Sequence, residues 1–163
     1  MKNQIDYKLI LYVLIPFLVA EVTNRVLAYG FDMNISVYTT ISETLLFLWK
    51  YVALVFWFWV GRQFGNLRTG KIVNFILGNS LWGVSLILFI WQFIFVSDVN
   101  RNFFIARISQ NYILGFVYWG SKAIDIFTNT INTTKVGIIA YLMMFIVFTG
   151  GFISVGYKTI KKN

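Results

Sequence analysis

The sequence lacks two of the side chains on which most enzyme sites and metal sites depend. It contains no cysteine, which excludes disulfide bonds, a thiolate nucleophile and thiolate ligation of a metal. It contains no histidine either, which removes the commonest general base and the commonest metal ligand of proteins. We therefore expect no cofactor and no metal site.

Charged residues are also scarce, at 12% of the 163 residues, whereas 58% are hydrophobic and 20% are aromatic. This charged fraction is about half that of a soluble domain, so residues 1–163 are expected to form a single membrane domain. The formal net charge is +8, but the basic residues stand at the ends of apolar runs and do not cluster on a solvated face. Nucleic-acid binding is therefore not expected.

Four apolar stretches are long enough to cross a hydrocarbon core about 30 Å thick, which takes roughly 20 helical residues. They cover residues 9–27, 41–61, 72–96 and 136–157. The predicted fold is an all-α integral membrane protein with four transmembrane helices and an amphipathic helical segment, residues 97–135, on the outer side between the third and fourth.

The orientation follows from the basic residues, because short cytoplasmic loops retain Lys and Arg. An even number of spans puts both termini on one side, together with the loop that carries Arg62, Arg68 and Lys71. We therefore expect both termini in the cytoplasm. Residues 1–20 also resemble a secretory signal, but we expect a retained first helix. The composition, rich in Asn, Ile and Lys, is typical of small bacterial envelope proteins and indicates a multi-pass protein of a bacterial plasma membrane.

The segment between the third and fourth spans has apolar residues at helical spacing, with Arg107, Gln110 and Lys122 on its polar side. This pattern predicts one or two amphipathic helices that rest in the outer interface of the bilayer. Alternatively, the segment caps a cavity or docks another subunit, in which case the contact residues would be Tyr112, Phe116 and Trp119. Its uninterrupted apolar part is too short for a fifth span.

Charges lie inside the first two predicted spans. The stretch "AEVTNRVL" carries Glu21, Asn24 and Arg25, and the second span carries Glu43 and Lys50. At about 1.5 Å per residue, Glu21 and Lys50 lie at similar depths, about 18 and 16 Å from the cytoplasmic end, and Arg25 lies near the depth of Glu43. An isolated charge in hydrocarbon is costly, so we expect Glu21 to pair with Lys50 across the two helices. The alternative is that Glu21 pairs only with Arg25 on its own helix, while Glu43 lies among the lipid headgroups and Lys50 extends towards the interface.

Polar and small residues also occur in the later spans. Asn79, near the middle of the third span, could hydrogen-bond another helix or face a ligand. Small residues in the third and fourth spans are expected to form packing faces: Gly78, Ser80, Gly83, Ser85, Gly150, Gly151 and Ser154.

No enzyme signature is found, so we expect a non-catalytic protein. The predicted function is that of a membrane subunit or small-ligand-binding component of a transport or cell-envelope complex, whose partner is another membrane protein or a second copy of the chain. One alternative is a homo-oligomeric transporter or channel. A second is an enzyme for lipid-linked substrates, with Glu21 or Glu43 as acid or base. In each case the intramembrane charges are candidates for the site.

Overall fold

The structure is a computed structural model that describes residues 7–32, 36–67, 70–126 and 132–160, and within these ranges it is all-α, as predicted. A π-helical turn at Trp91–Phe95 and a 3₁₀ turn at Asp98–Asn100 follow the third helix. The six α-helices are α1 (Tyr7–Asp32), α2 (Ser36–Asn66), α3 (Lys71–Ile90), α4 (Phe103–Tyr112), α5 (Leu114–Asp125) and α6 (Thr133–Ile160).

Among the described residues, three helical stretches are long and apolar enough to cross a membrane: Glu43–Asn66, Lys71–Phe95 and Thr133–Val155. They coincide with three of the four predicted spans and indicate a multi-pass membrane protein. The predicted first span, residues 9–27, lies within α1, a single helix of 26 residues that accommodates Pro16. Some of its side chains fall outside the described part of the chain, and its role as a fourth span stays a prediction.

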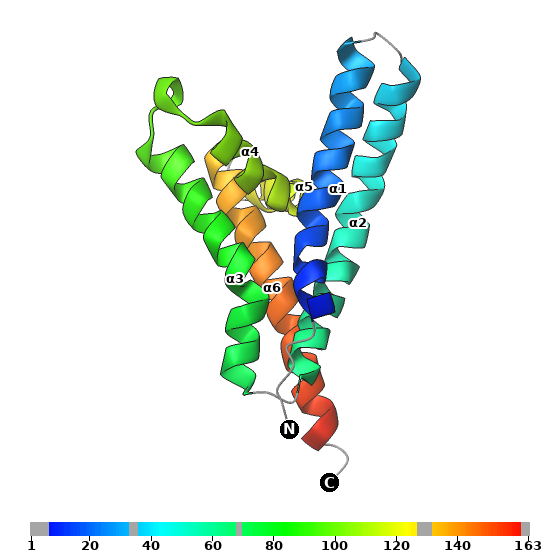
Figure 1. The fold of residues 1–163 in the computed structure, drawn as a ribbon, viewed down its shortest axis with the longest axis vertical. Coiled ribbons are helices and arrows are strands. Elements are labelled where there is room, and N and C mark those ends of the chain that lie inside the picture. The colour runs from blue at the N-terminus through cyan, green and yellow to red at the C-terminus, as the bar shows by residue number, and fades with distance from the viewer. Residues whose placement is uncertain (1–6, 33–35, 68–69, 127–131, 161–163) are drawn as a thin grey trace.

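The helices form a V (Figure 1). α1 and α2 run side by side in one arm, α3 forms the other arm, and α6 lies between them. α2 ends, α3 begins and α6 ends at the narrow end of the V, and α1 begins on the same side. The helices thus alternate in direction as the predicted topology requires.

The narrow end of the V is held by a close crossing of α2 and α6. A Cβ atom on Gly61 would collide with the carbonyl oxygen of Phe148, and one on Gly151 would collide with that of Phe58. On Gly65, a Cβ would lie 2.7 Å from the carbonyl oxygen of Phe152. Small residues allow helix backbones to approach closely in lipid, where packing drives association.

The predicted packing faces are confirmed only in part. Gly151 meets α2, and a Cβ on Gly78 would collide with the ring of Phe148, so both belong to close interfaces. Gly83 was wrongly assigned to a packing face, because a Cβ there would meet no atom within 4 Å. Gly61 and Gly65, the closest pair on α2, were not singled out from the sequence.

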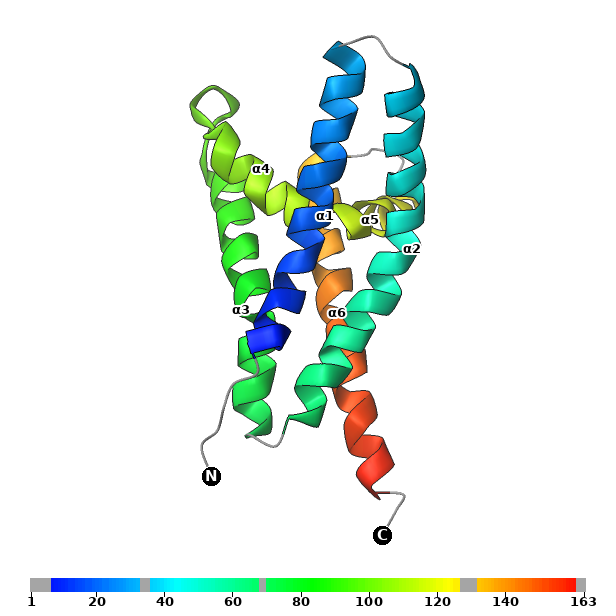
Figure 2. The same ribbon diagram turned by 45° about the vertical axis from the view of Figure 1, so that its right-hand side comes forward.

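The space between the arms is crossed by α4 and α5 (Figure 2). α4 runs from the end of α3 to α1, and α5 continues against α2 and α6. Tyr112, Ile113 and Phe116 are buried in the same hydrophobic cluster as Trp57 of α2 and Tyr141 of α6. The expectation that this segment only rests on the outer interface is therefore wrong, because its apolar side fills the interior of the V.

Two glycines allow α5 to enter this space. A Cβ on Gly120 would lie 2.7 Å from the carbonyl oxygen of Val136 in α6, and a Cβ on Gly115 would lie 2.9 Å from the indole nitrogen of Trp49 in α2. The backbone breaks between α4 and α5 at Ile113, with φ −98° and ψ 3°. Each helix is shorter than a membrane span, in agreement with the prediction that no fifth span occurs here.

Buried hydrogen bonds fix α4 in place. The hydroxyl of Tyr141 in α6 donates to the carbonyl oxygen of Ser109 at 2.9 Å and lies 2.6 Å from Oγ of Ser85 in α3. At the start of α4, Gln92 Oε1 accepts a hydrogen bond from the backbone N–H of Asn102 at 2.8 Å. These hydrogen bonds join α3, α4 and α6, and they satisfy polar groups that are buried away from water.

We predict that Gly61→Ala lowers the stability of the protein in mild detergent by about 1–3 kcal/mol, because the added methyl group forces α2 and α6 apart. Gly83→Ala is the matched control, since the same methyl group enters open space. Thermal unfolding of the two purified variants measures the difference. Equal stability of the two variants would contradict the close crossing.

Candidate functional site

The most polar group of contacts in the described chain joins α1 to α4. Oε1 of Glu21 accepts hydrogen bonds from Nε of Arg25 at 2.9 Å and from a terminal guanidinium nitrogen of Arg107 at 2.8 Å. Its Oε2 accepts one from Nδ2 of Asn111 at 3.0 Å. Asn24 completes the group by donating to Oδ1 of Asn111 at 2.8 Å. We call these five residues the α1–α4 polar cluster.

Helical spacing explains why the five side chains meet. Glu21 is three residues before Asn24 and four before Arg25, so all three share one side of α1. Arg107 and Asn111 are four residues apart and share one side of α4. Because α4 packs against α1, the two polar sides face each other. Glu21, Asn24 and Arg25 were candidates from the sequence; Arg107 and Asn111 were not.

The cluster carries a net positive charge that solvent or a ligand can reach. It holds two guanidinium groups and one carboxylate, and the exposed fractions of the side chains are 75% for Arg25, 51% for Arg107 and 21% for Glu21. A guanidinium has five N–H donors, and each arginine uses a single nitrogen to bond Glu21. The carboxylate is thus enclosed by donors, whereas both arginines have donors to spare.

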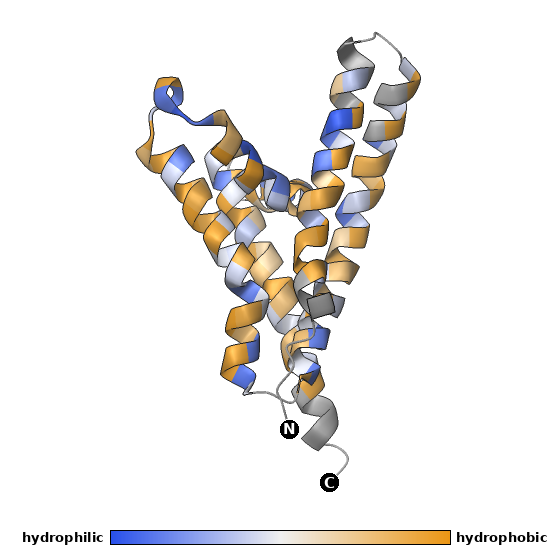
Figure 3. Ribbon diagram, in the orientation of Figure 1, coloured by the Kyte–Doolittle hydropathy of each residue, from blue (hydrophilic) through white to orange (hydrophobic). Residues whose placement is uncertain are grey.

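An apolar groove of about 240 Å³ adjoins the cluster. Phe17 is one helical turn before Glu21 on α1, and Ile108 and Tyr112 follow Arg107 and Asn111 directly on α4. Figure 3 shows hydrophilic residues in the upper part of α1, hydrophobic residues below them, and mainly hydrophobic residues along α3. The groove is lined by Leu14, Phe17, Leu81, Val84, Ser85, Leu88, Ile108 and Tyr112.

Lys50 does not pair with Glu21, so that prediction is wrong. Its ammonium nitrogen lies over the aromatic rings of Tyr118, Phe47 and Tyr51, at 3.7, 4.1 and 5.1 Å from their centroids. Aromatic rings in this position stabilise a cation through their quadrupole. The three rings thus stabilise the ammonium group of Lys50 in place of the carboxylate of Glu21.

Glu21 and Lys50 have different partners because of the position of the two helices that follow α3. α4 brings Arg107 to Glu21, while α5 brings Tyr118 to Lys50. The local pair of Glu21 with Arg25 is present, but it is not the only one, because Arg107 of α4 binds the same carboxylate oxygen. Glu43 is exposed, and no ion pair joins α1 to α2 among the side chains that the structure describes.

The remaining candidates are not members of the α1–α4 polar cluster. Asn79 is buried and donates to the carbonyl oxygen of Phe75 in its own helix at 2.9 Å, so it neither bridges helices through this bond nor lines the groove. Tyr112 and Phe116 are buried inside the chain. Trp119 donates its indole N–H to the carbonyl oxygen of Lys50 at 2.9 Å. The three residues expected to dock a partner contact other helices of this chain, and their docking role stays a prediction.

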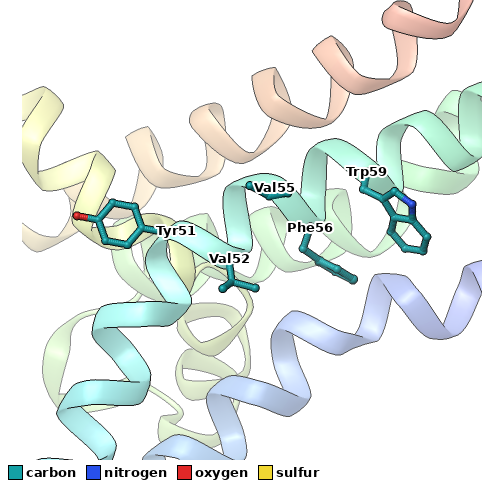
Figure 4. Close-up of a pocket in the computed structure, with 5 residues that line it drawn as sticks. All are labelled: Tyr51, Val52, Val55, Phe56 and Trp59. Atoms are coloured by element: carbon teal, nitrogen blue, oxygen red, sulfur yellow. The ribbon is translucent and has the colours of Figure 1, made fainter.

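A second groove, of about 490 Å³, lies along α2 and is shown in Figure 4. Tyr51, Val52, Val55, Phe56 and Trp59 line it, and none of them carries a charge. Such a surface is typical of a helix that faces lipid.

No protein-family model matches this chain, and no curated protein or solved structure matches it.

We predict that Glu21 and Arg107 are energetically coupled and that Glu21 and Lys50 are not. In a double-mutant cycle of Glu21→Gln and Arg107→Gln, the coupling in detergent unfolding should be about 1 kcal/mol, because the two side chains share a hydrogen bond. The cycle of Glu21→Gln with Lys50→Met is the control and should give less than about 0.5 kcal/mol. The reverse order would contradict the placement of α4 against α1.

Proposed function

We propose that the chain is a four-span membrane protein, α1 included, that acts without catalysis as the small-ligand-binding component of a transport or cell-envelope complex. The ligand is an amphiphile bound between α1, α3 and α4. Its apolar part lies in the groove, and its polar part contacts the α1–α4 polar cluster.

The observation that carries this proposal is the continuity of the two surfaces. The side of α1 that lines the groove presents Glu21 one turn beyond Phe17, and on α4 Arg107 directly precedes the groove residue Ile108. An amphiphile in a bilayer has the same arrangement, with a polar end and an apolar end, and ligand sites combine an apolar lining with few polar groups.

The contacts of Glu21 also favour binding over catalysis. A general base takes the substrate proton on a carboxylate oxygen, and each hydrogen bond that the carboxylate already accepts lowers its basicity. Both oxygens of Glu21 accept hydrogen bonds from within the chain, one from two arginines and the other from Asn111. Glu21 is better suited to hold α4 and to orient the two guanidinium groups than to act as the acid or base of a lipid-modifying enzyme.

The four-span topology predicts the accessibility of single cysteines, which the native chain lacks. A cysteine at Val99, which is 95% exposed beyond α3, should react with an impermeant maleimide in whole cells. A cysteine at Asn66, at the end of α2, should react only after the membrane is permeabilised, and so should one at Asn3. Labelling of Asn3→Cys in intact cells would show that α1 does not cross the membrane.

Blocking the groove should remove the bound amphiphile. Val84 lines the groove, so Val84→Trp places a large side chain where the apolar part of the ligand would lie. Ile87→Trp on the same helix is the control, because Ile87 is exposed but does not line the groove. Mass spectrometry of molecules extracted from the purified proteins should find an amphiphile with the wild type and Ile87→Trp only. Equal recovery from all three proteins, or recovery from none, would contradict the proposal.

A further inference from the structure

We propose that the polar end of the ligand is an anionic, phosphate-bearing headgroup, bound by the guanidinium groups of Arg25 and Arg107. This inference rests on the proposed function and adds the chemical class of the ligand. A preference for one class of headgroup would distinguish a specific site from an apolar surface that binds any lipid.

The charge of the cluster supports an anion. Glu21 neutralises one of the two guanidinium groups, and no other carboxylate forms an ion pair with Arg25 or Arg107 among the described side chains. The other acidic residues of the outer segment are paired elsewhere, Asp98 with Arg101 and Asp125 with Lys122. One positive charge therefore remains uncompensated beside the groove.

The geometry of the arginines suits phosphate in particular. Glu21 accepts Nε of Arg25 and a terminal nitrogen of Arg107 on the same oxygen, so both guanidinium groups are held around one point. Their remaining N–H groups form planar forks, which match pairs of phosphate oxygens and give short charge-assisted hydrogen bonds. A zwitterionic headgroup would bring a cation next to this surplus positive charge.

Other cations of the outer half are less suitable for this role. Lys50 is enclosed by three aromatic rings. Arg101 donates to the carbonyl oxygen of Gln92 and is paired with Asp98. Lys122 is exposed but pairs with Asp125 at 3.6 Å, on α5 and away from the groove lining. Lys122 is therefore a matched control for the loss of one positive charge.

The test is native mass spectrometry of the purified protein with phosphatidylglycerol or phosphatidylcholine of identical acyl chains. Wild type should bind phosphatidylglycerol about tenfold more tightly than phosphatidylcholine. Arg25→Gln and Arg107→Gln should each lose this preference, whereas Lys122→Gln should keep it. Arg25→Gln is the decisive variant because Arg25 is the most exposed residue of the cluster, so its replacement leaves the bond between Arg107 and Glu21 intact.

The outcomes separate this inference from the proposed function. If the two lipids bind equally, the anionic headgroup is wrong, even where Val84→Trp abolishes binding. If Arg25→Gln and Arg107→Gln keep the preference, the assignment of the headgroup to these two arginines is wrong. If Val84→Trp binds both lipids as the wild type does, the groove itself is wrong. Inorganic phosphate at millimolar concentration should not displace phosphatidylglycerol, because it cannot occupy the groove. Full displacement would identify a free anion as the ligand and overturn the assignment to a lipid.

Discussion

The close crossing of α2 and α6 at Gly61, Gly65 and Gly151 is the constraint on which the rest of the arrangement depends. Backbones in contact at one end of a pair of tilted helices must diverge towards the other end. The divergence leaves room between the arms, and α4 and α5 fill it with the buried side chains of Tyr112, Ile113 and Phe116. The amphipathic segment is thereby part of the core of the protein.

The insertion of α4 between the arms brings polar side chains against α1 and also leaves an apolar groove. Its polar side faces α1, and a polar side chain that leaves water must find partners. Glu21 supplies one partner to the buried Asn111 and also binds the half-exposed Arg107, which gives a carboxylate in a largely apolar helix a structural role. The same insertion closes one end of the space between α1 and α3 and leaves the groove beneath it. A charged cluster and an apolar groove thus arise together from one packing arrangement.

The sequence was sufficient to predict the helices and three of their candidate spans, because length and hydropathy alone determine those features. It was also sufficient to single out Glu21 and Arg25, since charges in an apolar run are conspicuous. Their partner in another helix is Arg107, and a comparison of depths on the first two helices could not find it. Arg107 belongs to a segment whose amphipathic pattern fits a membrane surface and a protein interior equally well.

One signal in the sequence could have shown whether the amphipathic segment lies on the membrane surface or in the protein interior. Gly115 and Gly120 lie within the predicted amphipathic helix, where glycine is unfavourable unless another backbone or a large side chain approaches closely. In the structure, Gly120 meets the backbone of α6 and Gly115 meets Trp49 of α2. Two glycines in a short helix therefore indicated insertion between other helices. The pairing of Lys50 with aromatic rings had no comparable signal, because Tyr118 reaches it from α5.

The central claim is that a lipid occupies the groove between α1, α3 and α4. Photocrosslinking in native membranes tests it most directly, with a photoreactive amino acid at Leu81 in the groove lining or at Ile87, an exposed residue of the same helix outside that lining. One sample is crosslinked before extensive detergent washing and a second sample after it. Leu81 should give a lipid adduct in both samples, whereas Ile87 should give one only in the sample crosslinked before washing. Loss of the Leu81 adduct on washing, to the same extent as that of Ile87, would contradict a bound ligand and leave only the lipid that surrounds any membrane helix.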